Sequence, residues 1–96
     1  IFENNTIVGC DTGISNALAE PGDLTILRNN VIANCGVAVS NGNTSDVVHV
    51  HVQSSFNTYW ANSVTFDGSY VGGISSSNDR SDDPRFVDAA SGDYSL

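Results

Sequence analysis

The sequence predicts an all-β protein: a short right-handed parallel β-helix of about three coils with a loop-rich C-terminal cap. Three observations support this fold class: an internal repeat, apolar bursts without helical spacing, and turn-forming residues between the bursts. The chain of 96 residues is at most one domain. We expect the coils to occupy residues 1–62 and an irregular capping segment to occupy residues 63–96.

The repeat lies in the first half of the chain. IFENNTIVGCDTGIS, beginning at Ile1, aligns without a gap with ILRNNVIANCGVAVS, beginning at Ile26, so that an Asn-Asn pair and a cysteine recur at the same places in both copies. Each copy holds short apolar bursts separated by Asn and Gly, which disfavour helix and favour turns. Three short strands joined by turns make one coil, and the inward side chains of successive coils stack into one core. We expect the paired asparagines to stack at a turn and to hydrogen-bond one another.

The spacing from Ile1 to Ile26 also predicts which side chains stack. We expect one inward column of Phe2, Leu27 and Val52, and one outward column of Glu3, Arg28 and Gln53. A third copy at this spacing is weaker, because Asn57 falls where the first two copies have isoleucine.

Two further segments follow from local pattern. Residues 15–20 are the one helix candidate, and Pro21-Gly22 ends it, so we expect a loop that leaves the first coil. Residues 47–52 alternate valine with histidine, which predicts a strand with the valines on one face and the histidines on the other.

The charge balance excludes two classes of partner. Eleven acidic residues face three basic ones, and the formal net charge is −8. Such a surface repels a phosphate backbone, so we expect no nucleic-acid partner. No apolar run approaches the roughly 18 residues that a membrane span needs, so we expect no membrane insertion.

Several segments resemble one known group of proteins. The runs NNTIVGC and NNVIANC, the stretch SSFNTYWANSVTFDG and the final DDPRFVDAASGDYSL are similar to the repeats and the tail of pectate-lyase-like right-handed parallel β-helix proteins. The final run resembles the Asp-Pro-x-Phe-Val-Asp tail that closes many bacterial secreted members. This resemblance implies an extracellular or cell-surface location, with a cytoplasmic one left open, and a polysaccharide partner. It implies no single activity, because one fold hosts many.

Cys10 and Cys35 occupy equivalent positions in the two copies. Stacked coils lie about 4.8 Å apart, which is within the range of Cα separations that a disulfide accepts. The alternative is that the two residues pack as small buried thiols.

Two pairs of side chains are candidate ligand-binding residues. His49 and His51 on one outward face would join a carboxylate in a metal or acid–base site, unless they are simply the solvated side of a strand. Tyr59 and Trp60 would form a platform on which a sugar ring stacks. The alternative is that Trp60 closes the open end of the last coil.

We expect no catalytic residues, no metal site and no cofactor. The chain has no Lys, and no Ser-His-Asp or Cys-His arrangement has a recognisable context. Ca²⁺ is the one ion that the acidic tail suggests, because clustered carboxylates suit it, but their spacing fits no known calcium loop. These carboxylates belong to Asp79, Asp82, Asp83, Asp88 and Asp93.

The function that these features predict is a non-catalytic β-helix module of a secreted or surface bacterial protein, either structural and interacting or carbohydrate-binding. Two alternatives stay open. The chain would be the C-terminal fragment of a polysaccharide lyase or glycoside hydrolase whose catalytic coils lie upstream. It would otherwise be a small free-standing protein that oligomerises through the open end of its N-terminal coil, because unpaired strand edges pair readily.

Overall fold

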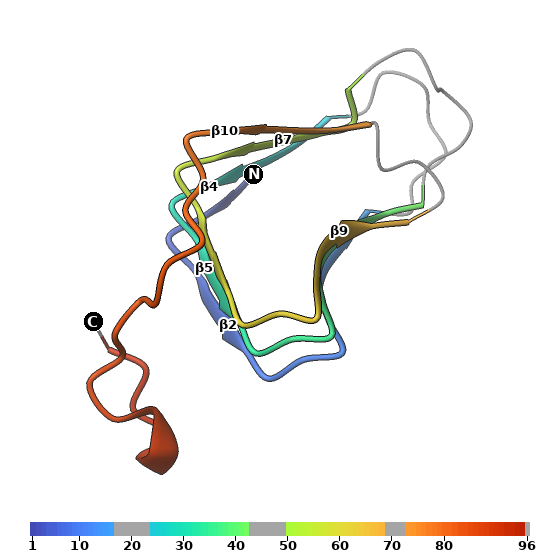
Figure 1. The fold of residues 1–96 in the computed structure, drawn as a ribbon. Coiled ribbons are helices and arrows are strands. Elements are labelled where there is room, and N and C mark those ends of the chain that lie inside the picture. The colour runs from blue at the N-terminus through green and yellow to red at the C-terminus, as the bar shows by residue number, and fades with distance from the viewer. Residues whose placement is uncertain (17–23, 43–49, 69–72, 96) are drawn as a thin grey trace.

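The computed structural model describes residues 1–16, 24–42, 50–68 and 73–95. Their strands form three parallel sheets in which successive coils lie side by side, and the chain is a short right-handed parallel β-helix, as predicted (Figure 1). The first sheet contains β1 (Phe2–Glu3), β4 (Thr25–Arg28), β7 (Val52–Ser55) and β10 (Ile74–Ser77) in that order. The second contains β2 (Thr6–Val8), β5 (Val31–Ala33) and β8 (Thr58–Trp60). The third contains β3 (Thr12–Asn16), β6 (Val37–Asn41) and β9 (Val64–Asp67).

The first two coils stack in the predicted register. Phe2 lies opposite Leu27, and Ile7 lies opposite Ile32, so that equivalent positions of the two sequence copies are paired. Leu27 and Ile32 are fully buried, because each has a coil on both sides, whereas Phe2 in the first coil is 47% exposed. The core therefore lies along the axis of the coils, and its side chains are most completely buried in the middle coil.

The third coil is offset from the second by two residues more than the second is from the first, so the predicted third members of both columns are wrong. Val52 lies opposite Thr25 and not Leu27, and the outward neighbour of Arg28 is Ser55 and not Gln53. The physical reason is the connection between β6 and β7, residues 42–51, which is two residues longer than the connection at residues 17–24. A shift of two residues keeps every side chain on its expected face but changes its neighbour.

The coils continue past residue 62, where the sequence predicted that they end. β9 pairs with β6, β10 pairs with β7, and Arg80 forms a parallel bridge with Thr58. The segment after Arg80 is loop-rich, with a short 3-10 helix at Ala89–Ser91. Figure 1 shows this tail on the outer side of the β2–β5–β8 sheet.

Two corners of each coil require a left-handed backbone. The first corner has φ between 56° and 60° in all four turns, at Asn4, Asn29, Phe56 and Asn78. The second has positive φ at Gly9, Asn34 and Ala61. Asn and Gly tolerate this conformation best, which explains why the repeat is rich in both, and Phe56 is the bulky exception.

The residue after each first corner points inward and continues an asparagine column. The backbone N–H of Asn5 donates to Asn30 Oδ1 at 3.0 Å, and that of Asn30 donates to Asn57 Oδ1 at 2.9 Å. The side-chain amides follow the same route, at 3.1 Å and 2.9 Å. The predicted stacking of asparagine amides is confirmed for Asn5 and Asn30.

Among the described residues, no helix is long and apolar enough to cross a membrane.

Candidate functional site

The structure places His51 differently from the prediction made from the sequence. His51 is fully buried and not outward, and Val50 is 42% exposed. His51 directly precedes β7, so the alternation of a strand does not apply to it, and its Nδ1 lies 3.5 Å from Asn41 Nδ2. His49 lies outside the described residues, so the predicted ligand role of the pair stays a prediction.

Tyr59 and Trp60 lie on opposite faces of β8. Tyr59 is buried at 5% exposure, and its ring meets Phe66 edge to face with centroids 5.2 Å apart. Trp60 is 36% exposed on the outer face. Neighbouring residues on a strand point to opposite sides, so the two rings do not form one platform. Of these two rings, Trp60 alone is exposed enough for a sugar ring to stack on it.

The asparagine column ends in a polar network that runs from buried residues to the partly buried Asp79 and the exposed Ser76. Asp79 Oδ1 accepts the backbone N–H of Asn57 at 2.9 Å and its side-chain amide at 3.1 Å. Asp79 Oδ2 accepts the hydroxyls of Ser54 at 2.6 Å and Ser76 at 2.5 Å. The Ser54 hydroxyl gives its one proton to Asp79, so the Tyr59 hydroxyl is the donor in the 2.5 Å contact between Tyr59 and Ser54. These groups satisfy one another inside the coil.

Tyr59 makes the free energy of unfolding depend on pH in the alkaline range. Burial raises the pKa of its hydroxyl to about 12, and the negative charge of Asp79 raises it further. Because the folded pKa exceeds the unfolded value of about 10, this contribution is complete below pH 10 and is lost as pH rises through about 12. We expect unfolding free energy to fall by up to about 2 kcal/mol across this window. Denaturant titrations at several pH values measure it.

The control for this expectation is a second tyrosine. Tyr59→Phe should remove most of the alkaline loss, while Tyr94→Phe, which changes a ring in the exposed tail, should keep it. An identical pH profile in Tyr59→Phe and the unsubstituted chain would show that another group titrates.

A cleft of about 410 Å³ lies between the outer face of the β2–β5–β8 sheet and the start of the tail. It is lined by Val31, Thr58, Arg80, Asp82, Asp83, Pro84 and Arg85. Val31 and Thr58 are neighbours across β5 and β8 and supply the sheet side. Arg80 is held beside β8, since its N–H donates to Asn57 O at 2.7 Å and its carbonyl accepts the N–H of Tyr59 at 2.8 Å.

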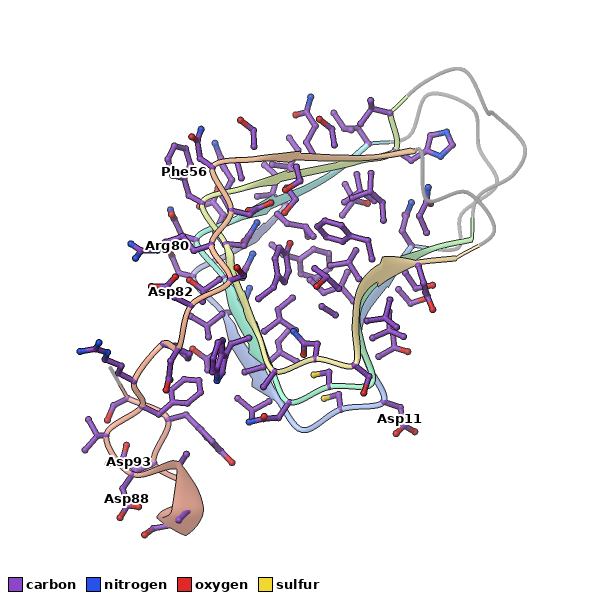
Figure 2. The ribbon with its side chains drawn as sticks, viewed as in Figure 1. Asp11, Phe56, Arg80, Asp82, Asp88 and Asp93 are labelled. Carbon is purple, nitrogen blue, oxygen red and sulfur yellow. The ribbon has the colours of Figure 1, made fainter. Side chains whose placement is uncertain are left out.

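Arg80 and Asp82 form a planar ion pair at this cleft. Arg80 Nε donates to Asp82 Oδ1 at 3.0 Å, and Nη2 donates to Oδ2 at 2.7 Å. This pairing raises the pKa of Arg80 and holds the pKa of Asp82 below its ordinary value. Both side chains are well exposed, so the pair adds little stability and its outer edges stay available for hydrogen bonds. Figure 2 shows both residues on the outer side of the coils.

The turn at the far end of the cleft brings in a second arginine. Asp83 Oδ1 accepts the backbone N–H of Arg85 at 2.8 Å, and Arg85 has φ of 59°. Two of the three arginines of the chain thus line one cleft, together with two aspartates, so the formal charges of its lining cancel. In a chain of net charge −8, this is a locally neutral, strongly polar surface.

Two exposed aromatic residues lie close in sequence to Thr58, which lines the cleft. Trp60 is on the same outer face of β8 as Thr58, because the two are separated by the inward Tyr59. Phe56 is 62% exposed at the corner before β8, and Figure 2 shows it projecting outward on the side of Arg80 and Asp82. Aromatic rings beside paired charged and hydroxyl groups suit a ligand with an apolar face and a polar rim.

The acidic tail and the cysteines have other surroundings. Within the described parts of the chain, no three His, Cys, Asp or Glu side chains lie close enough together to hold a metal ion. Figure 2 shows Asp88 and Asp93 in the tail, away from Arg80 and Asp82. Cys10 and Cys35 are both free thiols, the first exposed and the second buried. The disulfide considered from the sequence therefore stays a prediction.

Sequence reasoning assigned Asp79 to the acidic tail and missed its place at the end of the asparagine column, and it missed the cleft. Aligning the third coil with a two-residue insertion places Asn57 on Asn30 and Tyr59 on Ile32, which is the signal that would have revealed the continuing column. The cleft has no such signal, because it forms only when the tail returns to the sheet.

No protein-family model, curated protein or solved structure matches this chain.

Proposed function

We propose that this chain is a non-catalytic β-helix module that binds a carbohydrate chain at the cleft beside β8. The observation that carries this proposal is the composition of the cleft: a bidentate arginine–aspartate pair with exposed edges faces Thr58 of β8, and the outward Trp60 follows two residues later on the same face of that strand. Sugars have apolar faces that stack on aromatic rings, and rims of hydroxyls that both donate and accept hydrogen bonds. Asp82 accepts from such hydroxyls, and Arg80 donates to them.

The charges favour a neutral sugar. The formal charges of the cleft lining cancel, while the whole chain carries −8, so a uronic acid polymer meets long-range repulsion that a neutral one does not. We therefore expect neutral oligosaccharides to bind more tightly than acidic ones at low salt. Added salt screens the repulsion, so the two affinities should become more similar as the salt concentration rises.

The test uses calorimetric titration with neutral hexasaccharides of glucose, xylose and mannose and with a hexasaccharide of galacturonic acid. Trp60→Ala should weaken binding of the best ligand by about tenfold or more, since interface aromatic anchors contribute about 2 kcal/mol. Arg80→Ala should weaken it as well. Emission from Trp60, the single tryptophan, gives an independent readout in the unsubstituted chain.

Arg28→Ala is the matched control. It removes the same charge from an exposed pair with Glu3 on another sheet, outside the cleft lining. Arg28→Ala should bind as the unsubstituted chain does. Binding that falls equally in Arg28→Ala and Arg80→Ala, or no binding of any hexasaccharide, contradicts the proposal.

A further inference from the structure

Cys10 and Cys35 lie directly opposite each other on successive coils. Each follows a left-handed corner residue, Gly9 or Asn34. Two backbone hydrogen bonds bracket them: Gly9 N–H donates to Ala33 O at 3.1 Å, and Gly36 N–H donates to Cys10 O at 2.9 Å. Parallel coils in this register hold paired Cα atoms about 5 Å apart, which is within the range of Cα separations that a disulfide spans.

The two sulfur atoms have the same local arrangement in their own coils. Each thiol donates to the carbonyl two residues earlier, Cys10 to Val8 O at 3.8 Å and Cys35 to Ala33 O at 3.5 Å. The backbone N–H of Cys10 donates to Cys35 Sγ at 3.4 Å, which places that sulfur against the first coil. The third coil has Asn62 in this column, and its Oδ1 accepts the N–H of Cys35 at 2.9 Å. Cys10 is therefore the one thiol partner that Cys35 has, since the chain has two cysteines.

We propose that Cys10 and Cys35 form a redox-dependent disulfide that fastens the first coil to the second. A small-molecule disulfide is the oxidant. Cys10, which is exposed, gives its proton to water, and the resulting thiolate attacks one sulfur of this oxidant; a mixed disulfide forms, and the small thiolate that leaves takes up a proton. Cys35 loses its proton to water and attacks the Cys10 sulfur, which releases the second small thiol. One external disulfide is reduced to two thiols while two protein thiols become one disulfide.

The first coil is where such a bond has an effect. Its side chains are the most exposed of the core columns, with Phe2 at 47% and Ile7 only partly buried, while Leu27 and Ile32 in the next coil are fully buried. Such an element opens locally before the rest of the molecule. The disulfide opposes this opening, because the first coil can no longer separate from the second. This inference does not depend on the proposed carbohydrate binding.

The experiment treats the folded protein with oxidised glutathione and then measures intact mass, free thiols after denaturation, and amide hydrogen exchange. We expect a monomer without bound glutathione, without free thiols, and lighter by two hydrogens. Exchange of the β2 amides should slow by about tenfold or more, and dithiothreitol should restore the original rate.

Two single variants separate the roles of the cysteines. Cys35→Ser should stop at the mixed disulfide and retain one glutathione on Cys10. Cys10→Ser should react far more slowly, because Cys35 is only 3% exposed. Circular dichroism verifies that each variant is folded. A wild-type monomer that keeps both thiols or one glutathione, or disulfides that form only between molecules, overturns the proposal.

Discussion

Replacing Asn57 with alanine should remove at least about 3 kcal/mol of unfolding free energy, because several buried hydrogen-bonding groups lose their partner and each costs about 1–3 kcal/mol. Asn57 is fully buried. Its Oδ1 accepts the backbone and side-chain amides of Asn30, both at 2.9 Å, and its Nδ2 donates to Leu27 O at 2.9 Å and to Asp79. A domain of this size has only about 5–15 kcal/mol in total. Urea denaturation followed by circular dichroism and by Trp60 emission measures the loss.

Gln53→Ala is the control for the asparagine column. Gln53 is an exposed amide on β7, the strand that leads to Asn57, and its truncation should cost less than about 0.5 kcal/mol. A loss in Asn57→Ala that is as small as the loss in Gln53→Ala would mean that water replaces the column without cost.

Replacing Leu27 with alanine should cost about 2–5 kcal/mol, the usual range for truncating a fully buried leucine. Leu27 is 0% exposed and lies between Phe2 of the first coil and Ser54 of the third. Coils on both sides limit the collapse of the surrounding residues into the space that the side chain leaves. The same denaturation experiment measures the change.

Phe2→Ala tests whether position in the stack decides this cost. Phe2 belongs to the same column but is 47% exposed, so its truncation should cost about 1 kcal/mol or less, although phenylalanine is the larger side chain. A cost for Phe2→Ala that equals or exceeds that for Leu27→Ala would show that the first coil is packed as tightly as the second.

The first two coils could be predicted residue by residue because no insertion separates them. Every paired position from Phe2–Leu27 to Asn16–Asn41 keeps the spacing of the sequence repeat. The third coil was predicted with the wrong neighbours because its connection is longer, and because Ser54 and Tyr59 replace the aliphatic residues that mark the earlier coils. The strands continue to pair in the third coil, but the changed side chains leave no sequence pattern that shows which residues are neighbours.

The candidate site was harder to predict than the fold. Adjacent residues on a strand face opposite ways, so the separation of Tyr59 from Trp60 follows from the assignment of β8 alone. His51 is buried although it lies just before β7, so the alternation of valine and histidine does not predict its burial. The cleft requires the return of Arg80–Arg85 to the sheet, a long-range contact with no local pattern.

The asparagine column has a direction. Asn5 donates to Asn30, Asn30 to Asn57, and Asn57 to Asp79, so each amide depends on an acceptor that comes later in the chain. A ribosome synthesises the donors first and the carboxylate that terminates the series last. The nascent coils therefore emerge with their innermost polar groups still unpaired, and each pairs only when the next turn of the chain has left the exit tunnel. The inward amides of one coil therefore gain these acceptors only when the following coil has packed against it.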